Sequence, residues 1–289
     1  LHAADELTVA EEGKTSAVIC VDAGAGTDTG EKTRRGKPVV ARELERLAAD
    51  DLARYIELMS GARPRVVSDP QGIAQALDGD TPVFLVGEIA LKQRPELTTR
   101  LETVLKPNPF VVGKRSLDGV ARPDGIVIER RGNRIYVAGS NDRSHYYAVA
   151  RLLNLWGCRW YMPTEFGECI PTRATLTLGE LDEVYAPPFE IRGYWLSWNG
   201  AQDGRPEFTR RNFCHSDKFI SAHAIGRYLK DLVPEGGTAF NVPIAEEATM
   251  DHVADQLVEQ FAAGGNIRLG MDDGIYQSDS EIDAELHAN

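Results

Sequence analysis

Two adjacent carboxylates, Asp272 and Asp273, are the first candidates for chemistry. They follow a short apolar stretch over residues 267–271, which predicts a strand, and Gly274 comes directly after them. Carboxylates at the carboxyl ends of strands line the active sites of (β/α)8 barrels. A glycosidase needs two carboxyl groups that flank the scissile bond, whereas neighbouring residues on a strand point to opposite sides. Three roles therefore stay open for this pair: a turn or helix cap, a contact with a sugar hydroxyl, and a catalytic acid or base.

Trp198, Asn212, His215 and His223 are the other candidates for substrate binding. They follow an expected strand over residues 189–196, in the region where the substrate-binding loops of a barrel lie. Each side chain is also of a type found on an ordinary protein surface, so both interpretations stay open. The two histidines are too far apart for the i, i+4 pair of a helical metal site, and no carboxylate is suitably spaced. No metal is therefore predicted.

Two further patterns precede residue 162. The glycine-rich stretch over residues 24–30 follows a strand, but it lacks the G-x-G-x-x-G spacing of a dinucleotide loop, and the next helix begins too far along the chain. We therefore expect no cofactor. Trp160 and Tyr161 follow a helix directly, and their rings either pack against a sheet or stack on a sugar ring.

The four cysteines are Cys20, Cys158, Cys169 and Cys214. None of them forms a C-x-x-C pair, which argues against a zinc knuckle or a thioredoxin motif. Cys20 lies in an apolar run and is expected to be a buried thiol. Cys158 and Cys169 bracket a short segment, so they could form a disulfide in an exported protein, or they could remain free.

The spacing of apolar residues over the first 186 residues predicts a sheet with helices packed on it. The expected elements are strands over 17–21, 65–67 and 82–86, helices over 42–59 and 142–156, and a hairpin over 125–130 and 134–139. Pro187 and Pro188 break the preceding structure, so we place a domain boundary between residues 186 and 187. Beyond it, Thr249 is the expected N-cap of a further helix.

The composition and net charge indicate which classes of binding partner to expect. The chain has 289 residues, a formal net charge of −12 and 42% hydrophobic residues, which is consistent with a packed core. An acidic surface repels phosphate backbones and anionic bilayers, so we expect no nucleic-acid binding and no docking on such membranes. No apolar run is long enough to span a bilayer, so no membrane insertion is expected. The net charge neither favours nor disfavours the binding of uncharged ligands such as sugars.

Three segments stand in a characteristic order along the first part of the chain. They are the helix ARELERLAADDLARYIELMSGARPRVV, the hairpin DGIVIERRGNRIYVAGS, and the stretch DRSHYYAVARLLNLWGCRWYMPTEFGECIPTRATLTL. This series, over residues 16–195, resembles the N-terminal domain of family 67 alpha-glucuronidases and family 20 hexosaminidases. The resemblance implies an α/β sandwich that packs on a catalytic barrel and carries no catalytic residue.

The segments NVPIAEEATMDHVADQLVEQF and NIRLGMDDG resemble the start of an uncharacterised barrel of exported bacterial proteins. The resemblance implies that Asp273 lies at the end of an early barrel strand. The family's cysteine-containing continuation is absent after Gly274. A (β/α)8 barrel takes about 250 residues, so the barrel over residues 187–289 is expected to be incomplete. The catalytic carboxylates, which stay unassigned, are expected beyond the end of this chain.

The combined expectation is an α/β sandwich over residues 1–186, followed by an incomplete (β/α)8 barrel over residues 187–289. The chain is then the front part of a secreted or periplasmic glycoside hydrolase-like protein that acts on poly- or oligosaccharides, and it is inactive alone. A non-catalytic carbohydrate-binding or scaffolding protein is one alternative, and a cytoplasmic nucleotide-binding domain is another. The sequence does not define the sugar, the linkage or the oligomeric state.

Overall fold

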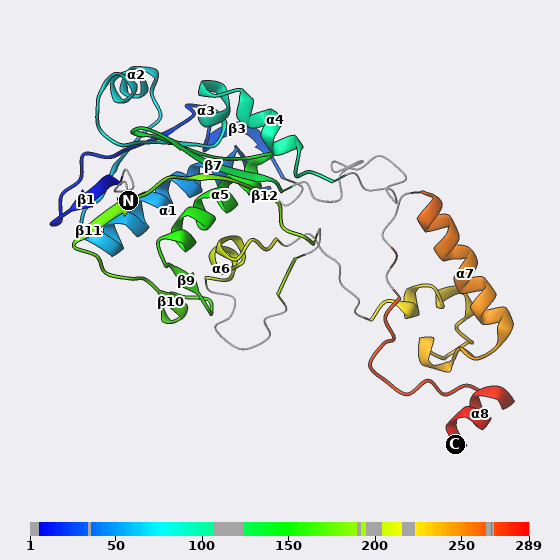
Figure 1. Cartoon of the computed structure of the whole chain (residues 1–289). Coiled ribbons are helices and arrows are strands. Elements are labelled where there is room, and N and C mark those ends of the chain that lie inside the picture. Colours follow the sequence, from blue (N-terminus) through cyan, green and yellow to red (C-terminus); the bar gives the residue numbers. More distant parts are fainter. Residues whose placement is uncertain are drawn as a thin grey trace. The chain divides into compact units, whose positions relative to one another are not determined.

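A computed structural model describes residues 6–33, 36–106, 124–189, 192–194, 204–215, 223–263, 267 and 269–288 (Figure 1). The chain forms two compact units. Unit 1 comprises Leu1–Pro107 and Val120–Ser216, and unit 2 comprises Asn108–Gly119 and Asp217–Asn289. The predicted boundary at 186/187 falls inside unit 1, because helix α6 (Arg205–Arg211) packs on helix α5 (Asp142–Leu155) of the same unit. A division into an accessory domain and a barrel start stays a prediction.

A six-stranded sheet forms the centre of unit 1, with strand order β12-β7-β8-β6-β2-β5. Strands β5, β2, β6 and β8 run parallel, and β7 and β12 are antiparallel to their neighbours. The strands are β2 (Val18–Val21), β5 (Arg65–Val67), β6 (Val83–Val86), β7 (Ile126–Arg131), β8 (Arg134–Gly139) and β12 (Asp182–Tyr185). The predicted α/β fold, a sheet with helices packed on it, is therefore confirmed for unit 1, and the structure adds that most of the sheet is parallel.

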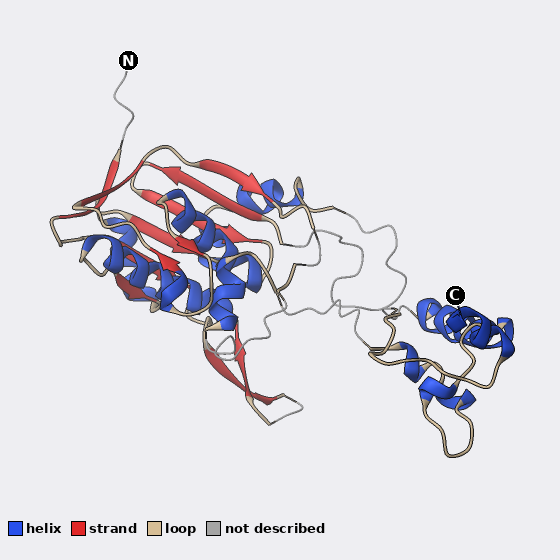
Figure 2. Ribbon diagram, turned by 90° about the horizontal axis from the view of Figure 1, so that it is seen from below, coloured by secondary structure: helices blue, strands red, loops and turns tan. Residues whose placement is uncertain are grey.

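Helices cover both faces of this sheet (Figure 2). Helices α1 (Glu43–Ser60) and α5 pack on one face, against Ile19 and Val21. The helices on the other face are α2 (Pro70–Asp78), α3 (Glu88–Gln93) and α4 (Glu96–Glu102). Because β2 is buried on both sides, all four of its residues are apolar, as is typical of a parallel strand. Each fully buried aliphatic side chain, such as Leu52 of α1, contributes about 2 kcal/mol to stability.

Local signals begin and end the two long helices. Helix α1 ends at Gly61, which adopts a left-handed conformation with φ of 76° and donates its N–H to the carbonyl of Glu57. Helix α5 begins with a capping box, in which the Asn141 side chain accepts from the Ser144 N–H and the Ser144 hydroxyl accepts from the Asn141 N–H. Both helices match the predicted ranges to within one residue.

Three short strand pairs were not expected from the sequence. They are β1 (Leu7–Glu11) with β11 (Thr175–Leu178), β3 (Thr27–Lys32) with β4 (Pro38–Ala41), and β9 (Arg159–Trp160) with β10 (Glu168–Cys169). All six residues of β3 are exposed. A strand pair outside the core needs no apolar alternation, so the polar sequence of β3 gives no strand signal.

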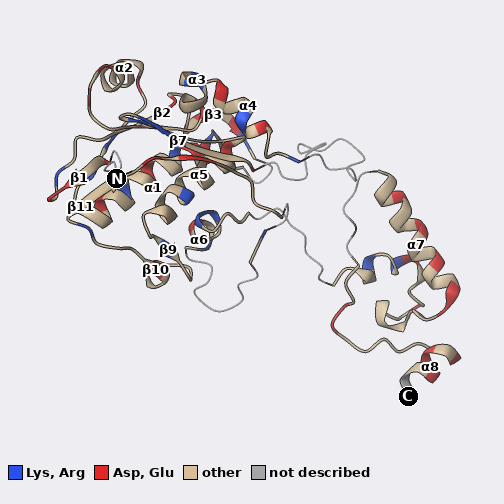
Figure 3. Ribbon diagram, viewed as in Figure 1, with Lys and Arg blue, Asp and Glu red and all other residues tan. Residues whose placement is uncertain are grey.

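Unit 2 consists of helices and turns over its described residues. Helices α7 (Glu247–Ala262) and α8 (Glu281–Ala288) carry acidic side chains and no Lys or Arg (Figure 3). Three 3-10 turns, η2 (Ile225–Arg227), η3 (Lys230–Leu232) and η4 (Ala239–Asn241), precede α7 and pack with it around a small core that includes Tyr228, Leu229 and Val253. None of the helices in the described part of the chain is both long and apolar enough to cross a bilayer.

Three local predictions in the second half are wrong over the described residues. Residues 267 and 269–271 form no strand, because the Gly270 carbonyl accepts hydrogen bonds from the N–H groups of Ala224 and Ile225 instead of from a neighbouring strand. Residues 189 and 192–194 form no strand either. Thr249 is not an N-cap, since α7 begins two residues earlier and buries Thr249 in its first turn. The predicted barrel is therefore not confirmed.

Candidate functional site

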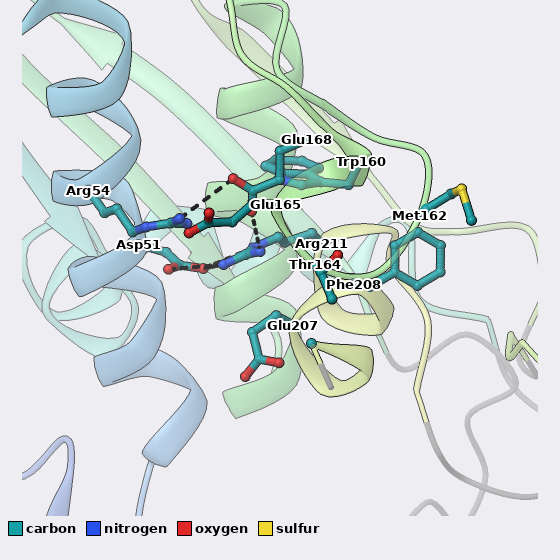
Figure 4. A pocket seen from close by; sticks show the side chains of 11 residues that line it. Asp51, Arg54, Trp160, Met162, Thr164, Glu165, Glu168, Glu207, Phe208 and Arg211 are labelled. Carbon is teal, nitrogen blue, oxygen red and sulfur yellow. Dashed lines mark hydrogen bonds and ion pairs between the residues drawn. The ribbon is translucent and has the colours of Figure 1, made fainter. Parts of the chain in front are cut away.

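Unit 1 contains a cavity of about 310 Å³ between α1, the β9–β10 segment and α6. Polar, charged and aromatic side chains converge on it (Figure 4). The lining residues are Asp51, Arg54, Trp160, Met162, Thr164, Glu165, Glu168, Gly204, Glu207, Phe208 and Arg211. This mixture of aromatic surface with a few convergent polar groups is typical of a small-molecule site.

Arg211 is the central charge of the cavity wall. It lies at the end of α6, and its guanidinium donates to two carboxylates from distant parts of the chain. Nη2 lies 3.0 Å from Asp51 Oδ2 of α1, and Nη1 lies 2.9 Å from Glu168 Oε1 of β10. Burial disfavours the charged form of Arg211, but the neighbouring Tyr146 and Asp51 outweigh it and raise the pKa of Arg211. The guanidinium is therefore a fixed cation that fastens α6 to α1.

Tyr55 links the aromatic part of the site to its charged part. Its hydroxyl accepts from Trp160 Nε1 at 2.8 Å and donates to Glu168 Oε1 at 2.6 Å. The two rings meet edge to face, with centroids 5.3 Å apart. Burial raises the pKa of Tyr55, so the hydroxyl stays protonated and keeps its donor role. Trp160, for which packing and ligand stacking were both open, is a buried wall residue with its indole N–H satisfied.

The remaining charges at the cavity are only partly engaged. Arg54 lies 3.5 Å from Glu168 Oε2, and its guanidinium sits 5.0 Å from the centre of the Tyr55 ring. Glu207 accepts from Arg210 at 3.1 Å. The side chain of Glu165 is exposed and makes no hydrogen bond or ion pair with the residues that the structure describes. The hydrogen bonds that join Arg211 and Tyr55 to Asp51 and Glu168 form an inner network. Hydroxyl groups of a ligand could bond with Arg54, Glu207 and Glu165 without breaking this inner network.

The sequence contained only part of the signal for this site. Asp51, Arg54 and Tyr55 stand at i, i+3 and i+4 on α1, so they share one helix face. The charges of Asp51 and Arg54 are also typical of the solvated side of an amphipathic helix, so this pattern alone does not indicate a site. Arg211 lies 160 residues from Asp51 and 43 from Glu168, and no local pattern relates residues so far apart.

The loop between β9 and β10 forms the outer wall and depends on Gly167. A Cβ at this position would lie 2.1 Å from the carbonyl oxygen of Met162, which is far inside van der Waals contact. We expect Gly167→Ala to lower the free energy of unfolding by about 1–3 kcal/mol, because the backbone has to move. Denaturant titration measures this, with Gly179→Ala as the control, since a Cβ at Gly179 meets nothing within 4 Å. Equal stability of the two variants would contradict the expectation.

The predicted pair Asp272 and Asp273 has a structural setting in unit 2. Asp272 Oδ2 accepts from the Gly226 N–H at 2.9 Å and from the Tyr276 hydroxyl at 3.1 Å. Asp273 is 93% exposed at its side chain and lies 3.4 Å from His223 Nε2, while its N–H donates to His223 Nδ1. The structure thus brings His223 and the two aspartates together, and the role of the two carboxylates stays a prediction.

Asn212 and His215, two further predicted binding residues, belong to unit 1. Asn212 ends α6, and its amide donates to the carbonyls of Trp160 and Phe208. The His215 N–H donates to the carbonyl of Arg192 at 2.9 Å, and the residue is half-buried. Trp198 lies outside the described residues. Whether these residues contact a substrate stays a prediction, and none of the described ones lines the unit 1 cavity.

The four cysteines are free thiols in this structure. Cys158 is buried with its Sγ 3.7 Å from Met59 Sδ, and Cys169 is exposed on β10. Burial raises the pKa of the Cys158 thiol to about 12, so it is an unreactive core residue. The structure thus shows the free form of Cys158 and Cys169 rather than the disulfide. Among the described residues, no group of three or more His, Cys, Asp or Glu could hold a metal ion.

Comparison with known proteins gives little further information. No protein-family model matches the chain, and no curated protein matches it. A solved structure described as "Structure of CpGH84D", a glycoside hydrolase, is similar with a TM-score of 0.38 and 14% sequence identity. The similarity covers 98% of this chain, and the chain spans 38% of that protein. This chain is therefore weakly similar in structure to a glycoside hydrolase, at a level that carries no argument about its activity.

Proposed function

We propose that this chain is part of a glycoside hydrolase-like protein that acts on poly- or oligosaccharides, and that the unit 1 cavity binds carbohydrate without hydrolysing it. The resemblance of residues 16–195 to the N-terminal domain of family 67 and family 20 glycosidases supports the first part. The contacts inside the cavity support the second part.

The observation that carries this proposal is the state of the two inner carboxylates. Glycoside hydrolysis needs one carboxyl group that gives a proton and a second that acts as a base or nucleophile across the scissile bond. Asp51 and Glu168 are both bound to Arg211, and each also accepts a tyrosine hydroxyl, from Tyr146 and Tyr55 respectively. Since their oxygens already serve the inner network, they stabilise the wall of the cavity and do not act as a catalytic pair.

Exposed aromatic side chains favour a sugar as the ligand. Tyr161 and Phe166 are 70% and 88% exposed on the β9–β10 loop, where they are the sequence neighbours of the lining residues Met162 and Glu165. Large apolar side chains that stay exposed next to a pocket are characteristic of binding surfaces. The flat rings match the apolar faces of pyranose rings, and Arg54, Glu165 and Glu207 offer partners for sugar hydroxyls.

From the sequence alone, we further propose that residues 187–289 are the start of a (β/α)8 barrel and that the catalytic carboxylates lie outside this chain. The sequence also suggests a secreted or periplasmic location. The second candidate is a non-catalytic carbohydrate-binding or scaffolding protein. The paired state of Asp51 and Glu168 is compatible with both, so turnover by a longer polypeptide distinguishes them.

Removal of an exposed aromatic ring tests the binding surface. We expect Phe166→Ala to weaken binding of an oligosaccharide about five- to tenfold, which corresponds to the loss of about 1 kcal/mol of stacking. Calorimetric titration with neutral β-linked gluco-, xylo- and chito-oligosaccharides measures this. Leu58→Ala on α1 is the control, because Leu58 is 47% exposed and belongs neither to the β9–β10 loop nor to the cavity lining. Equal affinities for both variants would refute a role for the β9–β10 loop.

A further inference from the structure

A second group of charged residues lies at the carboxyl edge of the sheet, away from the cavity. The parallel strands β2 and β6 are neighbours, but β2 leads to α1 on one face and β6 leads to α3 on the other. At this point Glu45, in the first turn of α1, is fully buried with 0% of its side chain exposed. A buried carboxylate costs several kcal/mol unless it is paired or protonated.

Glu45 has few partners in this position. Its Oε1 makes no hydrogen bond, and its Oε2 lies 3.4 Å from Arg42 Nη1. Gly87, with φ of 76°, closes the site from the end of β6, since a Cβ there would lie 2.4 Å from Glu45 Cγ. The Glu45 backbone N–H donates to Asp142 Oδ1 at 2.8 Å, which joins the start of α1 to the start of α5. The carboxyl group is thus enclosed at the junction of three helices.

Charged and titratable groups face Glu45 from each surrounding element. His145 of α5 is 1% exposed; its Nδ1 accepts from the Gly139 N–H at 2.9 Å, so its proton sits on Nε2, 3.4 Å from Glu88 Oε1 of α3. Asp22, at the end of β2, accepts from Arg42 and from Lys92 of α3. Arg42 is therefore shared between Asp22 and Glu45, and Asp142 is held by the start of α1.

The balance of these groups places the titration of Glu45 near neutral pH. Burial raises the pKa of Glu45 to about 7, against the opposing influence of His145 and Arg42. The hydrogen bond from His145 lowers the pKa of Glu88, so Glu88 keeps its charge at the edge of the cluster. Glu45 therefore changes charge inside a closed site as the pH passes neutrality.

We propose that Glu45, with His145 and Glu88, forms a pH-sensitive latch that holds the starts of α1, α3 and α5 together while Glu45 is protonated and loosens when Glu45 ionises. The sign follows from proton binding: the folded chain holds the Glu45 proton at pH values where the unfolded chain has lost it. The stabilisation is fully present below the ordinary pKa of about 4.5, and it is lost as the pH rises through about 7.

Thermal unfolding between pH 5 and pH 8 tests the latch. We expect the melting temperature of wild-type unit 1 to fall by roughly 5 °C or more over this range. Glu45→Gln should remove most of this fall and melt above the wild type at pH 8. Glu43→Gln is the matched control, because Glu43 is exposed in the same helical turn, and it should keep the wild-type slope. Equal slopes for Glu45→Gln and wild type would overturn the proposal.

A second measurement covers the case in which Glu45→Gln does not fold. Carbon-13 NMR of the wild-type carboxyl groups should show one glutamate that titrates near pH 7. Amide exchange at Gly87 and Gly139, corrected for intrinsic rates, should accelerate above that midpoint. A Glu45 carboxyl that titrates near pH 4.5 would overturn the latch. These measurements involve no carbohydrate, so they are independent of the proposed function.

Discussion

Replacement of Arg211 by Met should lower the free energy of unfolding of unit 1 by about 3 kcal/mol, the largest effect that we expect from a single substitution. Met keeps most of the volume but leaves Asp51 and Glu168 without their shared cation. The side chains of Asp51 and Glu168 are 19% and 10% exposed, so water does not fully replace the guanidinium. Urea unfolding followed by the fluorescence of the buried tryptophans measures the change.

Arg63→Met is the control for Arg211→Met. Arg63 and its partner Glu57 are 51% and 46% exposed, and a pair of this kind contributes between 0 and about 1 kcal/mol. The expected ranking is therefore a large loss for Arg211 and almost none for Arg63. If both variants unfold at the same urea concentration, the inner network does not stabilise the cavity wall, and the cavity loses its structural basis.

Replacement of Asp124 by Asn should cost about 2–3 kcal/mol at pH 7, the second largest effect. Asp124 is 1% exposed, and it lies 3.2 Å from both Arg143 Nε and Asn141 Nδ2 and also accepts from Arg192. It therefore ties the start of α5 to the segment that follows β12. Asn keeps the shape but removes the charge that balances the two arginines.

The pH dependence gives this prediction a second readout. Burial opposes the charge of Asp124, but Arg143 and Arg192 outweigh it and hold the pKa of Asp124 below its ordinary value. The stabilisation is therefore present above about pH 4 and is lost as the pH falls through the lowered pKa. The difference between wild type and Asp124→Asn should shrink toward pH 2–3. Asp50→Asn, at a site 43% exposed, serves as the control; a difference that does not change with pH would contradict the assignment.

The core elements of unit 1 could be predicted because their signals are local. Val18–Val21 is apolar at every position, and the buried residues of α1 recur at helical spacing up to the stop at Gly61. The hairpin at Gly132 and the cap at Asn141 are likewise encoded within a few residues. These patterns fix which face of each element is buried, and the α/β architecture follows.

The other elements depend on contacts that no local pattern contains. Strands β9 and β10 have only two residues each. They pair with each other because the tight loop between them, which requires a glycine at Gly167, brings them together. The apolar run at 267–271 looked like a strand, but its Gly270 carbonyl is used by residues more than forty positions earlier. In the same way, the helix face with Asp51 and Arg54 became a cavity wall only because Arg211 packs on it.

Equilibrium binding combined with a turnover assay tests the central claim most directly. The 289-residue chain should bind at least one neutral oligosaccharide saturably, lose affinity in Phe166→Ala, and release no product from aryl glycosides over hours. Absence of binding to every oligosaccharide, or hydrolysis that disappears in Glu165→Gln, would contradict a cavity that binds carbohydrate without catalysis.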